Sequence, residues 1–484
     1  LYATEHGPQA NIAVKGMSNV LKIQNKPIHT ETFSIKASMG LPKGKLPESL
    51  SANAVLTLKN KGSITATGVV PLVTTGPLNL SATVDEVDLG LLASFAPLSI
   101  ATGTGKVSAK VQIEGRDEGT VHVVKANFRV TENANISIPL NDNNGNKTLD
   151  VGVKDLKGNA RLSRSEDGIE LSVSDLVSSL SRGGRLSLSA DYSKSTTGED
   201  LQAGFKITKA ELGELFSLFN VTTVDAIGRG ELAGSYSSSS TTKTMQFNFY
   251  FPKTTIIKKN DTFTYELPLK ELQGRVNYLQ TASQAHFHVS KASANLLGGT
   301  LSISGSNQLE PVVKPNVRFV MNDIELKSLC TTLGLDDFSA RGPVRVEGLL
   351  AGNIWWPRIS ARVIADAPKL YWRLDEDSKY PLGLGKTTGR VEFKRDKEGF
   401  RLDFKDVATT ALDGSLASNG TFRLTPQAHL DLEFSMARAT AKKLAVLLGI
   451  DDFSFAGTLN AQAKLVGPAK NPKLTAQLRL DDAR

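Results

Sequence analysis

Apolar and polar residues alternate in twos along most of the chain. Clear examples are "VSAKVQIEG" at residues 107–115, "RLSLSADYS" at 185–193 and "TLSISGS" at 300–306. Successive side chains of a β-strand point to opposite faces, so this period predicts strands with one apolar and one polar face. Turn residues interrupt the alternation about every 6 to 12 positions, as expected for antiparallel strands joined by short turns. The chain is therefore predicted to be mainly β.

Four short runs with helical spacing interrupt this alternation. The runs at 325–335 ("ELKSLCTTLGL") and 440–450 ("TAKKLAVLLGI") carry apolar residues at the same offsets, and earlier versions stand at 88–98 and 211–221. "GLDDFSARG" and "GIDDFSFAG" overlap the ends of the later two runs and lie 115 residues apart. Each run predicts one short amphipathic helix per repeat, and the repeated Asp pair is interpreted as a turn or cap after the helix.

Glycines mark the same repeat in two further ways. A Gly and an alternating strand follow the four runs at intervals of 125, 112 and 115 residues, at Gly105, Gly230, Gly342 and Gly457. A second marker, within "LKGNARL", "LQGRVNY" and "TTGRVEF", recurs after 116 and 115 residues, at Gly158, Gly274 and Gly389. Because the two markers are independent and share one period, they predict a repeat array of antiparallel strands.

The period divides the chain into five expected segments. They are a partial first repeat at 1–86, repeats at 87–206 (helix near 88–96), 207–322 (helix near 210–219) and 323–437 (helix near 325–333), and the start of a final repeat at 438–484 (helix near 440–448). Each complete repeat would contain several strands and one short helix.

The apolar face of the predicted sheet has little to cover it. Aromatic residues are only 6% of the chain, and many strand positions carry small or medium aliphatic side chains. A dense sandwich core normally needs larger rings and a second layer, which one helix of about ten residues per repeat does not supply. Two interpretations stay open: a closed solenoid core, or an apolar groove available to another apolar molecule.

A groove would be lined by the apolar positions of the alternating strands. Period two supports a shared face within each strand, but it does not say which face points inward from strand to strand. Burial worth about 0.8 kcal/mol per methylene would hold an acyl chain there without head-group specificity. The candidate lining residues are Val107, Ala109, Val111, Ile113, Leu186, Leu188, Leu301, Ile303, Val344, Val346, Ile359, Ala361, Val363, Val391, Phe393, Leu459, Ala461, Ala463 and Leu465.

Charge and composition narrow the functional classes. The net charge is +8, but the basic residues are scattered singly, which disfavours a nucleic-acid partner. No apolar stretch approaches the roughly 20 residues of a membrane-spanning helix. The opening "LYATEHGPQA" has no signal-peptide features, so we expect a piece of a longer protein. The single cysteine, Cys330, is expected to be a small core residue.

Motifs for catalysis or cofactor binding are weak. His286 and His288 share a strand face and could hold a metal, but no further ligand type accompanies them, so a polar strand face is preferred. "TGTGKVS" at 102–108 lacks the first Gly and the Ser or Thr of a phosphate loop, and "NDNNGNKTLD" at 141–150 lacks the Gly and Glu of an EF-hand. The sequence predicts no enzyme activity, no cofactor and no metal site.

A family resemblance rests on the order of these motifs. The Leu-rich helix, "DDFSxxG", an alternating strand, "G-x-x-x-x-P" and a further alternating strand resemble the AsmA-like superfamily of Gram-negative bacteria. The ending "LNAQAKLVGPAKNPKLTAQLRLDDA" at 459–483 is most similar to the translocation and assembly module (TamB) proteins. The resemblance covers nearly the whole chain. It implies an elongated, twisted, U-shaped (taco-like) sheet with an apolar groove.

The resemblance also implies a location and partners. The expected protein is periplasmic, is anchored to the inner membrane through a segment outside this sequence, and conducts phospholipids to the outer membrane by their acyl chains. TamB-like members are also linked to an outer-membrane barrel protein. Two alternatives stay open: a β-solenoid scaffold with a closed core, and a chaperone-like factor that pairs strands of outer-membrane barrel precursors.

Overall fold

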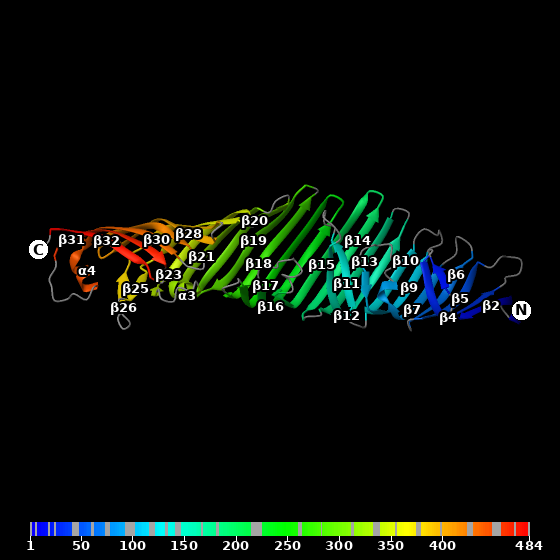
Figure 1. Ribbon diagram of the computed structural model, residues 1–484. Helices are drawn as coiled ribbons and strands as arrows, with labels where there is room; N and C mark the ends of the chain where they lie inside the picture. Colours follow the sequence, from blue (N-terminus) through cyan, green and yellow to red (C-terminus); the bar gives the residue numbers. More distant parts are fainter. Residues whose placement is uncertain are drawn as a thin grey trace. The chain divides into compact units, whose positions relative to one another are not determined.

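The structure is a computed structural model dominated by strands (Figure 1). It describes residues 2–4, 7–17, 20–23, 26–40, 48–59, 62–72, 78–91, 102–115, 122–130, 134–140, 147–165, 168–180, 183–213, 225–259, 264–281, 283–310, 314–332, 339–353, 356–373, 379–396, 399–423, 429–447, 456–468 and 471–482. Several predicted features lie outside these residues, namely the Asp pairs at 336–337 and 451–452, the turn at 141–146, and parts of the first two predicted helices, 92–96 and 214–219.

The prediction of a mainly β chain is confirmed, since most strands belong to one large antiparallel sheet that is not closed into a barrel. The chain divides into two compact units, each described below by itself. Unit 1 comprises Leu1–Leu218 and Glu231–Met245, and unit 2 comprises Phe219–Gly230 and Gln246–Arg484. The five-segment division by repeats stays a prediction.

Unit 1 is a meander of antiparallel strands. Its strands are β1 (Tyr2–Thr4), β2 (Gly7–Met17), β3 (Val20–Ile23), β4 (Lys26–Gly40), β5 (Ser49–Leu58), β6 (Ser63–Pro71), β7 (Leu78–Asp88), β8 (Thr102–Thr104), β9 (Lys106–Gly115), β10 (His122–Val130), β11 (Ala134–Leu140), β12 (Lys147–Arg164), β13 (Gly168–Leu180), β14 (Arg185–Ser195) and β15 (Gly198–Glu211). Pairing runs in the order β2-β4-β5-β6-β7-β9-β10-β12-β13-β14-β15. The short strands β8 and β11 pair with each other, and β11 extends the pairing along β12.

Unit 2 continues the same construction. Its strands are β18 (Thr264–Thr281), β19 (Ala285–Leu296), β20 (Gly299–Glu310), β21 (Lys314–Glu325), β23 (Pro343–Asn353), β24 (Trp356–Ala365), β27 (Thr387–Asp396), β28 (Gly399–Ala411), β29 (Gly414–Arg423), β30 (His429–Thr440), β31 (Thr458–Pro468) and β32 (Lys473–Asp481). These strands pair in that order, and Figure 1 shows β18 to β21 side by side. Residues of β16 (Asp225–Ser238) and β17 (Thr242–Lys259) belong to both units.

Short helices and a second, small sheet join the ends of unit 2 strands. The helices are α3 (Leu326–Thr332) and α4 (Ala441–Leu447), within the segments where the sequence predicts them. In unit 1, residues 89–91 and 212–213 are helical where the first two predicted helices begin. The small sheet consists of β22 (Ser339–Arg341), β25 (Lys369–Arg373) and β26 (Lys379–Gly383), with α3 against β22 and α4 against β26.

One backbone hydrogen bond recurs at the start of three helical segments. The first helical N–H donates to the carbonyl of the marker glycine 16 residues later: Leu89 to Gly105 (2.8 Å), Leu326 to Gly342 (3.0 Å) and Ala441 to Gly457 (3.1 Å). The first N–H groups of a helix have no partner inside the helix, so this bond fixes the helix against the next strand. The three glycines have φ between 119° and 133°, which other residues rarely adopt.

Bulges shift the register near the same ends of the strands. Seven of them carry a residue with φ between 50° and 58°: Glu86, Asp155, Asp175, Glu271, Asp323, Asp406 and Arg438. The neighbouring strand satisfies some of the freed N–H groups; the N–H of Asp406, for example, donates to Asn419 Oδ1 at 2.7 Å. A bulge inserts one extra residue, so apolar residues three apart return to one face.

The fully buried apolar residues gather in clusters beside these bulges and helices. Val87 in unit 1 is 0% exposed and packs with Leu58 and Val84. In unit 2, Ile324 is 1% exposed and packs with a cluster that includes Leu296. Burial of such side chains stabilises the fold by roughly 1.5–3 kcal/mol each. In both units, these two buried clusters therefore lie beside the bulged ends of the strands.

Candidate functional site

Strand pairing in unit 1 brings the apolar positions of different strands onto one face. Directly opposed residues of an antiparallel pair lie on the same face of the sheet. Ile113 of β9 is opposite Leu80 of β7 and Val124 of β10, and the pairing continues through β12 and β13 to β14. The unit 1 candidates that share this face are Val107, Ala109, Val111, Ile113, Leu186 and Leu188.

A row in which most side chains are small crosses this face of unit 1 from strand to strand. From β4 to β15 its members are Ile35, Ala54, Ala66, Ala82, Val111, Ala126, Ala160, Val173, Ala190 and Ala203. Larger residues flank it, such as Leu162 on one side and Phe128 on the other. We call this row the small-residue row. It lowers the middle of the apolar face relative to both sides.

Unit 2 also collects its candidates on one face. Its central row, from β20 to β31, is Ile303, Phe319, Gly348, Ala361, Val391, Phe404, Gly420, Leu432 and Leu465. The unit 2 candidates on this face are Leu301, Ile303, Val344, Val346, Ile359, Ala361, Val363, Val391, Phe393, Leu459, Ala461, Ala463 and Leu465. We call the row from Ile303 to Leu465 the central row, and the candidates beside it on the same face its flanks.

This apolar face is half-buried over most of its area. Only five of the nineteen candidates are buried: Val107, Val344, Val346, Ala361 and Leu459. The other fourteen are intermediate, and on β14 they alternate with exposed residues of the polar face. At β32, Leu478 is 64% exposed. A packed solenoid core would bury these positions, whereas the half-buried side chains leave apolar surface accessible along the face.

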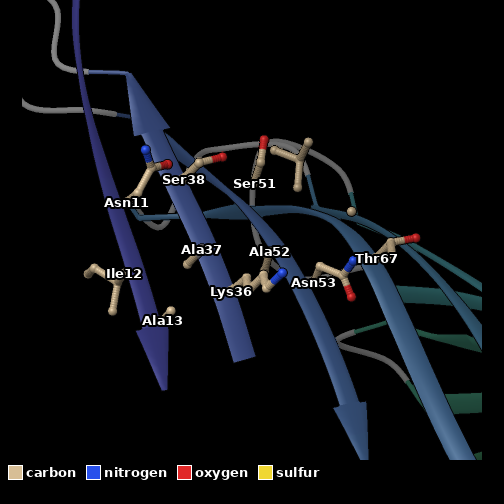
Figure 2. Close-up of a pocket in the computed structure, with 12 residues that line it drawn as sticks. Asn11, Ile12, Ala13, Lys36, Ala37, Ser38, Ser51, Ala52, Asn53 and Thr67 are labelled. Carbon is tan, nitrogen blue, oxygen red and sulfur yellow. The ribbon is translucent and has the colours of Figure 1, made fainter. Parts of the chain in front are cut away.

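A hollow of about 620 Å³ lies over β2, β4, β5 and β6 (Figure 2). One paired row of its lining contains Ile12, Ala37, Ala52 and Gly68. The next strand carries Leu80 in this row, so the small residues account for the hollow. Sequence reasoning missed it because the candidates began at residue 107. The sequence signal for the hollow is the presence of Ala and Gly at apolar positions of the first strands.

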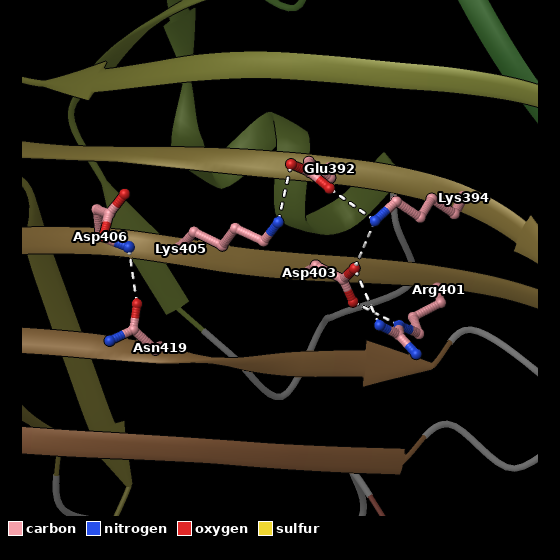
Figure 3. Close-up of polar contacts among 7 residues, drawn as sticks. All are labelled: Glu392, Lys394, Arg401, Asp403, Lys405, Asp406 and Asn419. Carbon is pink, nitrogen blue, oxygen red and sulfur yellow. Dashed lines mark hydrogen bonds and ion pairs between the residues drawn. The ribbon is translucent and has the colours of Figure 1, made fainter. Parts of the chain in front are cut away.

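A network of charged residues crosses β27 and β28 on the polar face of unit 2 (Figure 3). Lys394 Nζ lies 2.7 Å from Glu392 and 3.2 Å from Asp403, and Lys405 Nζ lies 2.9 Å from Glu392. Asp403 is 4% exposed, and its hydrogen bonds from Arg401, then from Lys394, lower the pKa of its carboxyl below the usual value. Hydrogen bonds from Lys394 and Lys405 likewise lower the pKa of Glu392. The network joins two strands electrostatically.

The two histidines of the sequence analysis lie on the polar side of β19. His286 Nε2 is 2.8 Å from Gln284 Oε1, and His288 is exposed. Among the residues that the structure describes, no group of three or more His, Cys, Asp or Glu is placed to hold a metal ion. The glycine-containing segment at 102–108 forms β8 and the start of β9. The side chain of Cys330 lies outside the described part of the chain.

Comparisons with known proteins do not assign the chain to a family. No family model, curated protein or solved structure matches the chain. Within the described ranges, every helix is too short or too polar to span a lipid bilayer.

Proposed function

We propose that the protein is a conduit for phospholipids, with the apolar face as a distributed binding surface for acyl chains. The observation that carries the proposal is that, within each unit, the candidate residues lie on one apolar face and most of them are half-buried. Each methylene that leaves water for this face gains about 0.8 kcal/mol. Because the candidate positions on this face are all apolar, a tail would move along it in small steps.

The proposal includes an architecture in which the sheet curves into a U-shaped, taco-like groove with one short helix per repeat. The small-residue row supports a floor between taller sides, and the repeated helix-to-glycine hydrogen bond supports a repeated helix. The resemblance to AsmA-like proteins supports a periplasmic location, an inner-membrane anchor outside this chain, transport between the inner and outer membranes, and a barrel protein as a further partner. The proposed role requires no catalysis, cofactor or metal.

Photocrosslinking in cells tests this proposal. A photoreactive residue at Ile303 should capture phospholipid, whereas one at Ser302, exposed and next along β20, should not, because neighbouring residues face opposite sides of the sheet. Phospholipid extracted from the purified chain should be quantified in parallel. Equal capture at the two positions, or none, contradicts the conduit. Capture of unfolded barrel proteins at Ile303 would instead support the chaperone-like alternative.

A further inference from the structure

Phenylalanine rings on the apolar face of unit 2 occupy the space beside glycines of neighbouring strands. Phe319 of β21 is directly opposite Gly348 of β23. A Cβ added at Gly348 would lie 2.2 Å, 2.5 Å and 2.9 Å from three atoms at the end of the Phe319 ring. Phe249 and Gly274 repeat the arrangement, with the Cζ atom of the ring 2.6 Å from such a Cβ.

The φ angles at these two positions do not require glycine. Gly348 and Gly274 have no left-handed φ, unlike the marker glycine Gly342, whose φ is 119°. The backbone conformation at Gly348 would therefore accept a side chain. A Cβ at Gly274, by contrast, would also lie 2.7 Å from the carbonyl oxygen of Lys291 and 2.9 Å from the Cβ of Ala292. What glycine supplies is room for the ring, since the three nearest atoms to the missing Cβ of Gly348 all belong to Phe319.

The pair affects how far the side chains of the central row rise from the sheet. Phe319 lies between Ile303 and Gly348 in the row that an acyl chain would follow. A ring that rises from the sheet would obstruct that path, whereas a ring whose end rests over glycine leaves the middle of the face low. Without the space at Gly348, the ring must rotate away from the neighbouring backbone.

We propose that Phe319 and Gly348 act as a positioning pair that sets the depth of the apolar face for acyl chains; this inference rests on the proposed function. Phe249 and Gly274 are in a related contact, but there the carbonyl oxygen of Lys291 and the Cβ of Ala292 also limit the space. The competing explanation is that glycine and ring pack only to stabilise the sheet. The two explanations differ in what happens when both partners are removed.

The test measures binding of a phospholipid with a fluorescent acyl chain to the full chain, to three variants and to one control variant. Gly348→Ala should bind about fourfold more weakly, the equivalent of one methylene left unburied. Phe319→Ala removes apolar surface and should weaken binding by itself, but adding Gly348→Ala to Phe319→Ala should weaken binding no further, because the ring that needs the space is gone. Gly383→Ala is the matched control, because a Cβ there meets nothing within 4 Å. Urea midpoints of all variants report the stability effect separately.

The outcomes distinguish a failure of the positioning pair from a failure of the proposed function. Binding by Gly348→Ala at the wild-type level, or a further loss of binding when Gly348→Ala is added to Phe319→Ala, contradicts the positioning pair while the conduit stands. A wild-type chain that binds no probe contradicts the proposed function and the pair together. If Gly348→Ala does not fold, the comparison of Phe319→Ala with the double variant still decides, because both lack the ring and weaker binding by the double variant contradicts the pair.

Discussion

The two units keep the middle of their apolar faces low in different ways. Unit 1 uses a row in which most members are alanine, so each strand contributes its own small residue. Unit 2 mixes large and absent side chains, and Phe319 fits only because Gly348 is opposite. In unit 1 the face is low because single residues are small, whereas in unit 2 it is low because a large residue lies opposite a glycine. Mutations should therefore act independently in unit 1 and jointly in unit 2.

The largest effect should come from the feature that the units have in common, the buried clusters beside the bulges. Ile324→Ala should lower the free energy of unfolding of unit 2 by about 2–5 kcal/mol, because the side chain is 1% exposed and a cavity would remain. Ile303→Ala, on the same face but half-buried, should cost about 1 kcal/mol. Urea unfolding measures both. Equal losses would contradict the separation between a stabilising end and a lining surface.

A smaller effect should appear when a charge enters the small-residue row of unit 1. Ala190→Asp should weaken binding of a fluorescent phospholipid by about tenfold, because a carboxylate loses hydration under an acyl chain. Ser189→Asp is the control, since Ser189 is exposed on the opposite side of the same strand. If both variants bind equally well, lipid does not use this row, and the comparison between the units loses its functional meaning.

The smallest effect concerns the charged network of unit 2. The lowered pKa of Asp403 means that its contribution to stability is present above the unfolded-state pKa of about 3.9 and is lost as pH falls through the folded value. Wild type should therefore lose more stability than Asp403→Asn on acidification below about pH 4. Acid unfolding followed by circular dichroism measures this difference. Parallel curves would show that the Arg401 and Lys394 contacts contribute nothing.

The effect of salt on stability should distinguish this network from an exposed ion pair. Asp413 has a pKa lowered by hydrogen bonds from Lys443 and Thr440, but its side chain is 57% exposed. Raised salt screens exposed charges more than buried ones. The stability difference between wild type and Asp413→Asn should therefore shrink in high salt, while that for Asp403→Asn should persist.

Sequence alone predicts the strands and the two C-terminal helices well, and the reasons are local. The alternation in "VSAKVQIEG" reports the two faces of β9, and the marker glycines report backbone conformations that other residues rarely adopt. The runs before Gly342 and Gly457 correspond to α3 and α4. These features depend on neighbouring residues, so the linear pattern contains them.

The shared face and the bulges depend on long-range pairing and were not predicted. A signal for the bulges does exist: apolar residues three apart enclose polar residues in "VDEV" at 84–87, "MNDI" at 321–324 and "FKDV" at 404–407. Each run marks a register shift. The small sheet of β22, β25 and β26 and the Phe319–Gly348 contact have no comparable signal, since their partners are distant in sequence.

The most direct test of the conduit is a photocrosslinking scan along β27. Positions 389 to 394 should capture phospholipid with a period of two, with signal at Gly389, Val391 and Phe393 and none at Arg390, Glu392 and Lys394. This period is expected because only one face of the strand lines the proposed path. Capture without alternation, or the absence of phospholipid at Val391 and Phe393, would contradict the account.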